Sequence, residues 1–175
     1  MFGAENLQIR ETRMSALLDA MPGVGATPGV GATPRAEVAT SCGTLILNTK
    51  GQLLLCHVTG ALHWDIPKGM REPGESTFEA AKRELREETG LQFTDALFEE
   101  IGGFKYLKHK NLHLYKVRAP ESLGRLDHLS CKSHFLQRDT GKLLPEMDSF
   151  CWAFRHDIMS LCLLPMAQKL LSLKW

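Results

Sequence analysis

The chain has 175 residues, of which 43% are hydrophobic and 23% are charged, with a formal net charge of +1. This supplies enough apolar side chains for one globular domain with an extension. The near-neutral net charge argues neither for nor against a nucleic-acid partner. The five cysteines include no Cys-x-x-Cys pair and follow no secretory signal, so we expect no zinc site and a location in the reducing cytoplasm.

Residues 1–34 differ in composition from the rest of the chain. The hexapeptide Pro-Gly-Val-Gly-Ala-Thr occurs at residues 22–27 and again at residues 28–33. Two glycine-rich copies are too few for a solenoid and are typical of a flexible linker. We therefore predict an N-terminal extension over residues 1–34 and a folded domain over residues 35–175. A weak helical periodicity at residues 4–20 leaves open a segment that docks on a partner subunit.

The folded domain is predicted to begin with two strands, Val38–Leu47 and Gln52–Val58, joined by a hairpin turn at residues 48–51. A loop containing Trp64-Asp65-Ile66-Pro67-Lys68-Gly69 follows. The next segment, Glu72-Pro73-Gly74-Glu75, has proline and glycine at the two central positions of a tight turn.

A helix with a defined start and end comes after this turn. Ser76-Thr77-Phe78-Glu79 has the pattern of a capping box, and Thr89-Gly90 provides a left-handed stop. A helix turns by about 100° per residue, which predicts three faces. The buried face holds Phe78, Ala81 and Leu85, the neighbouring face holds Glu84, Glu87 and Glu88, and the solvent face holds Glu79, Lys82 and Arg86.

The second half of the domain is predicted to hold three more strands and a final helix. The strands are residues 97–106 and 112–118, which flank a turn, and residues 150–154; residues 120–145 are polar and irregular; the helix covers residues 157–173 and restarts at Pro165. We expect its leucines and methionines to lie in the core, and its apolar run is too short to cross a membrane. Strands around one helix, closed by another, predict an α/β/α sandwich.

The acidic face of the first helix is the strongest chemical signal in the sequence. Glu84, Glu87 and Glu88 stand at positions i, i+3 and i+4, where like charges repel one another. They also border the buried face, where unpaired charge is costly, and Arg83 alone cannot neutralise all of them. A solvated helix face explains this pattern less well than a divalent cation does. Mg²⁺ prefers oxygen ligands and shares its coordination with substrate phosphates.

This region resembles the signature of the Nudix family of MutT-like hydrolases, G-x5-E-x7-R-E-U-x-E-E-x-G-U. Every fixed position is matched, by Gly69, Glu75, Arg83, Glu84, Leu85, Glu87, Glu88, Gly90 and Leu91. The strands before the signature, the approach at residues 64–69 and the segment at residues 145–152 are also similar to that family. The resemblance implies an α+β fold, a Nudix-type α/β/α sandwich with a mixed β-sheet. It does not cover the N-terminal extension or residues 120–145.

The resemblance further implies a Mg²⁺-dependent pyrophosphohydrolase, with Mn²⁺ as a possible substitute. Its substrate would be a nucleoside diphosphate linked to another moiety, such as a dinucleoside polyphosphate or an ordinary or oxidised nucleoside triphosphate. Carried over by position, Glu84, Glu87 and Glu88 would hold the metal, with the backbone carbonyl of Lys68 as a further ligand. Either Glu84 or Glu88 would also accept a proton from the attacking water.

Three more residues take roles from the same resemblance. Glu75 and Arg83 would pair and brace the loop against the helix, with Arg83 as a phosphate clamp as the alternative. Nudix enzymes often supply another acid from a late loop, and Glu146 is our candidate for this metal ligand or base.

Five residues near the signature are candidates for substrate binding: Trp64, Lys68, Gly69, Tyr106 and Lys108. Trp64 would stack on a base or pack in the core, and Tyr106 would flank a nucleobase. Lys68 would contact a phosphate or stand in solvent, while Gly69 would let the backbone approach the ligand. Lys108 belongs to a basic turn that would attract an extended polyphosphate or be a plain exposed hairpin tip.

Alternative functions remain open at this point. The same fold could be a non-catalytic nucleotide-sensing domain, although such a sensor has no need of every metal-binding carboxylate. ADP-ribose, coenzyme A, nucleotide sugars and capped RNA ends also fit the signature, but an RNA-decapping role would call for a broad basic face. We expect a nucleotide or other diphosphate-containing small molecule as the partner, no membrane, and a homodimer as one possible assembly.

Overall fold

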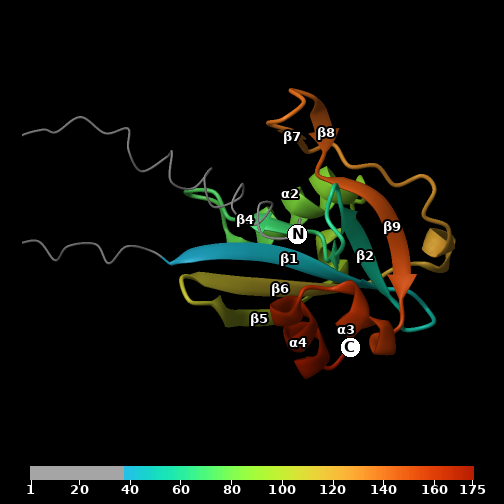
Figure 1. Cartoon of the computed structure of the whole chain (residues 1–175). Helices are drawn as coiled ribbons and strands as arrows, with labels where there is room; N and C mark the ends of the chain where they lie inside the picture. The colour runs from blue at the N-terminus through green and yellow to red at the C-terminus, as the bar shows by residue number, and fades with distance from the viewer. Residues whose placement is uncertain (1–37) are drawn as a thin grey trace, which may run out of the picture. The chain divides into compact units, whose positions relative to one another are not determined.

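The structure is a computed structural model that describes residues 38–175 (Figure 1). The predictions of a linker over residues 1–34 and of helical periodicity at residues 4–20 lie outside the described residues. In the described part of the chain, every helix is too short or too polar to span a bilayer.

Two long strands form the centre of the main sheet. Strand β1 (Ala39–Leu47) runs parallel to β6 (Lys110–Arg118), and the two are paired from Ala39 and Lys110 to Leu47 and Arg118. From Ser41 onward every residue of β1 is buried, as expected for a strand with both faces of its sheet covered.

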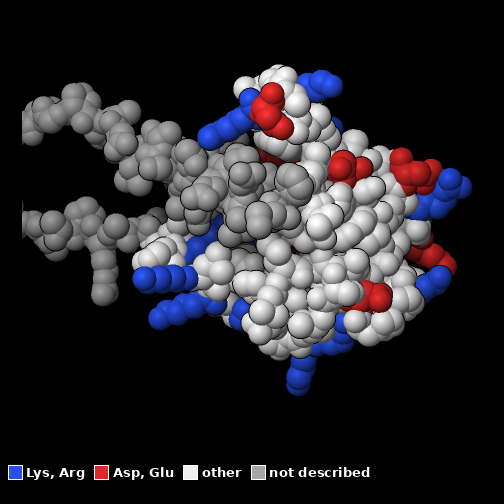
Figure 2. All heavy atoms as spheres, viewed as in Figure 1, with Lys and Arg blue, Asp and Glu red and all other residues white. Residues whose placement is uncertain are grey.

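The other strands of this sheet pair antiparallel, so the predicted mixed sheet is confirmed. Strand β5 (Phe98–Leu107) pairs with β6, and both β2 (Leu53–Val58) and β4 (Lys68–Met70) pair with β1. The outer partners of β2 are β3 (Trp64–Asp65) and β9 (Met147–Ala153). Basic side chains gather at the end of the sheet where the β5–β6 hairpin turns (Figure 2).

The helices cover both faces of the sheet, which confirms the α/β/α arrangement and the α+β class. On one face, α3 (Ile158–Leu161) and α4 (Leu164–Ser172) contribute to a core with apolar residues of β1, β2 and β6. On the other face, Ala80, Ala81 and Leu85 of α2 (Thr77–Thr89) pack against alternate residues of the same strands. Short 3-10 helices at Asp95–Leu97 and Arg155–Asp157 precede β5 and α3.

Both predicted boundaries of α2 are confirmed. The hydroxyl of Ser76 accepts the backbone N–H of Glu79, and the Glu79 carboxylate accepts the N–H of Ser76. At the other end Gly90 has a φ of 77°, the left-handed conformation that glycine adopts without strain. Lys82, on the solvent face, is paired with Asp95.

Three expectations need correction. Residues 64–70 are not a plain loop, because β3 and β4 form there. Residues 120–145 are not wholly irregular: Glu121–Gly124 is a 3-10 helix that buries Leu123, and β7 (His134–Leu136) pairs with β8 (Leu143–Pro145). The strands β1 and β2 pair only at Leu47 and Leu53, after which β2 turns to β9.

The prediction that the leucines and methionines of the last helix lie in the core is only partly right. Ile158, Met166 and Leu170 are buried, whereas Met159 and Leu164 are exposed. The chain is extended at Cys162, so α3 ends after one turn and α4 starts with a new helical phase. The predicted restart near Pro165 is therefore present, but each short helix turns only one face to the core, so not every leucine and methionine is buried.

Candidate active site

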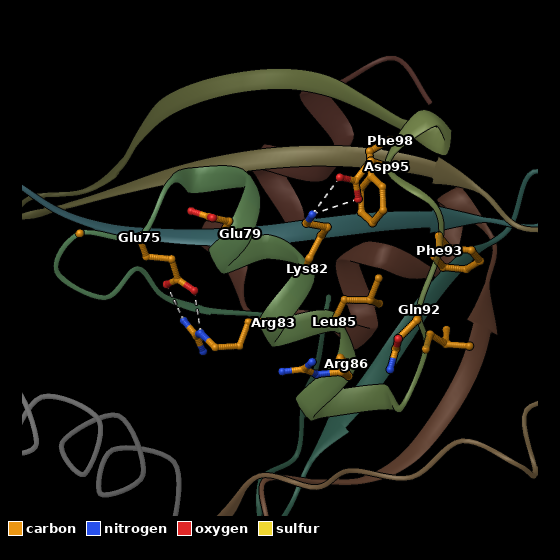
Figure 3. A pocket seen from close by; sticks show the side chains of 12 residues that line it. Glu75, Glu79, Lys82, Arg83, Leu85, Arg86, Gln92, Phe93, Asp95 and Phe98 are labelled. Atoms are coloured by element: carbon orange, nitrogen blue, oxygen red, sulfur yellow. Dashed lines mark hydrogen bonds and ion pairs between the residues drawn. The ribbon is translucent and has the colours of Figure 1, made fainter.

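The turn before α2 is fixed by an arginine on the helix. Glu75 donates its backbone N–H to Glu72 O at 3.1 Å, and Gly74 takes a φ of 80°. From α2, Arg83 donates through Nε and Nη2 to the two carboxylate oxygens of Glu75, at 2.9 and 3.0 Å, and through Nη2 to Met70 O at 2.9 Å (Figure 3). The predicted pairing of Glu75 with Arg83 is present, and it ties the loop to the helix.

The same arginine reaches the acidic face of α2. Its Nη1 donates to Glu84 Oε1 at 2.7 Å and to Glu87 Oε2 at 3.2 Å. Hydrogen bonds from Arg83 hold the pKa of Glu75 below its usual value, and the Glu75 carboxylate in turn raises the pKa of Arg83. The guanidinium therefore stays charged.

Two of the three glutamates predicted to hold metal are buried. Glu84 is 8% exposed and Glu88 is fully buried. Glu88 Oε2 accepts the backbone N–H of Lys68 at 2.9 Å, which fixes β4 next to the helix. Burial raises the pKa of Glu84, and the negative charges of Glu87 and Glu146 act in the same direction. Glu146, from a distant part of the chain, is connected to the end of α2 through Ser133, which accepts the backbone N–H of Glu146 at 3.0 Å and donates its own to Glu87 O at 3.3 Å.

Gly69 is the point at which β4 approaches the cluster. A methyl group added to its Cα would stand 2.1 Å from the Glu84 carboxylate. Only glycine leaves room for that carboxylate against the backbone. The predicted role of Gly69, an approach of the backbone to a ligand, stays a prediction.

The donor set suits Mg²⁺ in its chemistry. It consists of carboxylate and carbonyl oxygens, the ligands that Mg²⁺ prefers. A divalent cation would stabilise the charged form of Glu84, which burial and neighbouring negative charges disfavour. Within residues 38–175, however, no three acidic, histidine or cysteine side chains converge closely enough to hold an ion. Glu84 and Glu87 instead share the guanidinium of Arg83.

Lys68 differs from both of its predicted roles, since each placed its ammonium at an accessible position. The side chain is 6% exposed, and its Nζ pairs with Asp65 Oδ2 at 2.6 Å. The ammonium points into the interior, while the backbone of the same residue contacts Glu88. The acid three residues earlier was the available signal for this internal pair.

The structure does not bring the remaining substrate-binding candidates onto the acidic face. Trp64 and Tyr106 are half-buried against the core on the α4 side of the sheet, and burial raises the pKa of Tyr106. Lys108 is exposed at the tip of the β5–β6 hairpin. Trp64 and Tyr106 therefore pack against the core, and Lys108 stands at an exposed hairpin tip.

One polar pair near Trp64 was missed by the sequence reading. His57 Nδ1 lies 2.5 Å from Asp148 Oδ1, and the His57 ring lies 5.0 Å from the Trp64 ring between centroids. The pair joins β2 to β9 across 91 positions in the chain, so no local sequence pattern predicts it.

A hollow of about 650 Å³ lies on the solvent side of α2, and Figure 3 shows the side chains that line it. Phe93, Phe98 and Leu85 supply apolar lining, and the ion pair of Lys82 with Asp95 lies beside them. Four signature residues line the hollow, namely Glu75, Arg83, Leu85 and Leu91, but none of the three glutamates predicted to bind metal does. It is therefore distinct from the acidic face.

A model of the NUDIX domain matches residues 38–158. The chain belongs to the Nudix family. It is 36% identical over 119 residues to a 17.7 kDa protein in the e-segB intergenic region of Enterobacteria phage T4, a match covering 63% of this chain and 78% of that protein. It is also 37% identical over 67 residues to an RNA pyrophosphohydrolase of Rhodopseudomonas palustris (strain BisA53), covering 34% of this chain and 38% of that protein.

Among solved structures, the MutT protein from Methanosarcina mazei Go1 has a TM-score of 0.51 and 23% identity, with 76% of this chain and 89% of that chain covered. This similarity concerns the fold. Family membership makes the chain a hydrolase that acts on phosphorus-containing acid anhydrides.

Replacing Glu75 by glutamine is expected to lower the free energy of unfolding by about 1–3 kcal/mol at pH 7, the usual range for hydrogen bonds to a charged group. The native pKa of Glu75 is lowered from 4.5, so its ionised form stabilises the fold above that pH. The contribution is lost as the pH falls through the native pKa. Urea denaturation of both proteins at pH 7 and pH 3 measures this: the difference should shrink at pH 3, and an unchanged difference would contradict the assignment.

Proposed function

We propose that the chain is a Mg²⁺-dependent pyrophosphohydrolase that cleaves a nucleoside diphosphate linked to another moiety. The observation that carries this proposal is the acidic face of α2, with buried Glu84 and Glu88 set against the backbone of Lys68 and Gly69. In the proposal Glu84, Glu87, Glu88, the Lys68 carbonyl and Glu146 would hold the ion. Bound there, Mg²⁺ would supply charge stabilisation at the phosphoryl oxygens and lower the pKa of a coordinated water. Mn²⁺ would substitute for it.

The residues of the chain would then handle a proton and fix geometry. The water oxygen forms a bond to phosphorus, the bridging P–O bond breaks, and the water proton passes to the carboxylate of Glu84 or Glu88. Both carboxylates are buried, Glu84 at 8% exposure and Glu88 at 0%, so both stay candidates for this general-base role. Glu75 and Arg83 hold the turn and the helix in register and make no direct contact with the reacting atoms in this scheme.

The β5–β6 hairpin supports a substrate with an extended anionic chain. Lys105, Lys108 and His109 are exposed at its tip. On β1, Ala39 pairs with Lys110 of this hairpin and Cys42 pairs with Gly69, and three residues of a strand span about 10 Å. The basic tip and the glycine beside Glu84 are therefore at the same end of the sheet. We favour a dinucleoside polyphosphate, with an ordinary or oxidised nucleoside triphosphate as the next candidate.

A substrate panel tests the reaction. The full chain with Mg²⁺ is incubated with dinucleoside polyphosphates, ordinary and oxidised nucleoside triphosphates, ADP-ribose, coenzyme A, nucleotide sugars and RNA with a 5′-triphosphate, and the products are separated by chromatography. We expect Mg²⁺-dependent cleavage of a diphosphate linkage. Cleavage of none of them with Mg²⁺ or Mn²⁺ would favour the alternative, a non-catalytic nucleotide-sensing domain.

Replacing Lys105 and Lys108 together by alanine is expected to raise KM for a dinucleoside polyphosphate severalfold and to change kcat little, because a remote charge contact stabilises substrate and transition state alike. The effect should shrink at high salt. Lys50→Ala, in the exposed turn between β1 and β2, is the matched control. Equal KM values for the double variant and the control would remove the hairpin from the substrate site.

Several other expectations remain proposals. They are the catalytic domain boundary at residue 35, a homodimer, a cytoplasmic location and the lack of a nucleic-acid partner. The RNA arm of the panel addresses the last, since the Rhodopseudomonas palustris relative is named for an RNA substrate.

A further inference from the structure

Residues 130–133, here called the clamp segment, lie between the end of α2 and the start of β9. They lie outside the sequence signature at residues 69–91 but within the matched NUDIX domain. On the α2 side, Lys132 donates its backbone N–H to Glu87 O at 2.6 Å, Ser133 donates to the same oxygen at 3.3 Å, and Ser130 donates to Thr89 O at 3.2 Å. The last carbonyls of a helix have no partner within the helix, and here the clamp segment supplies it.

The opposite side of the clamp segment holds Glu146. Glu146 donates its backbone N–H to Ser133 O at 3.0 Å, and the Ser133 hydroxyl points at Glu146 Oε2 at a longer distance of 3.4 Å. Cys131 Sγ accepts the N–H of Met147 at 3.4 Å, and Thr59 donates to Glu146 O at 3.0 Å. Ser133 thus bonds both to the backbone of Glu87 and to Glu146, the proposed fourth acid of the site.

Placing a fourth carboxylate beside three others is unfavourable unless other contacts hold it there. Ser133 bonds to the backbone of both Glu87 and Glu146, so two residues with like charges are held near each other and their repulsion opposes this arrangement. The backbone hydrogen bonds of the clamp segment act against this repulsion. They connect Glu146 to the end of α2 that bears Glu87 and Glu88. This is a means of holding the late acid at the cluster.

We infer that the clamp segment is a positioning element that sets Glu146 against the α2 glutamates and thereby raises the affinity of the site for a divalent cation. This inference rests on the proposed function. It assigns Lys132 and Ser133 roles as positioning residues, acting through their backbone N–H groups and, for Ser133, through its carbonyl and hydroxyl.

The test compares Lys132→Pro with Lys132→Ala. Both remove the same exposed charge, but only proline removes the N–H that donates to Glu87 O. Titration calorimetry with MgCl₂ or MnCl₂ on the full chain without substrate should show affinity reduced about 10-fold in Lys132→Pro, the low end for residues that support metal ligands. Lys132→Ala should match the parent chain. Equal affinities in the two folded variants would overturn the inference.

A second pair of variants covers the case in which the proline variant does not fold. Ser133→Ala should weaken cation binding in the parent chain and cause no further loss in a Glu146→Gln background, because both changes act on the same group. Ser133→Thr should restore affinity, and Thr140→Ala, in the β7–β8 turn, should leave it unchanged. Full additivity of Ser133→Ala and Glu146→Gln would overturn the inference, since it would show that Ser133 acts elsewhere.

A last comparison separates this inference from the proposed function. Glu84→Gln should reduce cation affinity whether or not the clamp segment has a role. If Glu84→Gln weakens binding and the clamp variants do not, the inference fails and the proposed function stands. If Glu84→Gln, Lys132→Pro and Ser133→Ala all leave cation binding unchanged, both the inference and the proposed function fail.

Discussion

Replacing Glu87 or Glu88 by glutamine is expected to lower Mg²⁺-dependent turnover by about a hundredfold or more. Losing one charged ligand removes several kcal/mol of transition-state stabilisation, and each 1.36 kcal/mol corresponds to about a tenfold change in rate. The fold should survive both changes. Glutamine has nearly the same shape, and at position 88 its carbonyl oxygen can still accept the N–H of Lys68 that Glu88 accepts at 2.9 Å.

Steady-state rates over a range of MgCl₂ concentrations measure this effect, with melting temperature as the check on folding. Glu79→Gln is the matched control on the same helix. Glutamine also completes a capping box, so the bonds between Ser76 and position 79 should persist and activity should be unchanged. Near-normal rates in both Glu87→Gln and Glu88→Gln would reject the acidic face as the metal site.

The largest loss of stability is expected from breaking the pair of Asp65 with Lys68. Their side chains are only 11% and 6% exposed, and Nζ and Oδ2 lie 2.6 Å apart. Removing one member of a buried ion pair leaves an uncompensated charge and typically costs about 3–5 kcal/mol. Lys68→Met and Asp65→Asn should each show this loss in urea denaturation at pH 7.

The double variant Asp65→Leu with Lys68→Met is the informative companion. Replacing both members of a buried pair by apolar groups is often neutral, so the double variant should regain most of the lost stability. Asp95→Asn breaks the pair with Lys82 in which the aspartate is 68% exposed, and it should cost less than about 1 kcal/mol. Single variants at Asp65 or Lys68 that are no worse than Asp95→Asn would contradict the assignment.

Features written within one short stretch of sequence were predictable. The capping box at Ser76 and Glu79 and the left-handed Gly90 depend on residues between positions 76 and 90, and both are present in the structure. Glu75 and Arg83 are eight positions apart, and the intervening turn and helix start bring them together.

Features that depend on distant partners were not predictable from local pattern. The parallel pairing of β1 with β6 and the contact of His57 with Asp148 join segments about 70 and 91 positions apart. Asp65, three residues earlier, indicates a partner for Lys68, but the burial of the pair depends on distant segments that cover it. Strands β7 and β8 are short and largely exposed, so they lack the alternation of apolar and polar residues that marks a half-buried strand.

Arg83 donates five hydrogen bonds, to Glu75, Glu84, Glu87 and Met70 O, and a guanidinium has five N–H groups. Its donor capacity is therefore fully used, and two of the five bonds go to carboxylates proposed to bind Mg²⁺. Any ion that recruits Glu84 and Glu87 has to compete with this built-in counterion. Loading such a site amounts to an exchange of one positive group for another, and the arginine keeps its remaining bonds to the turn throughout.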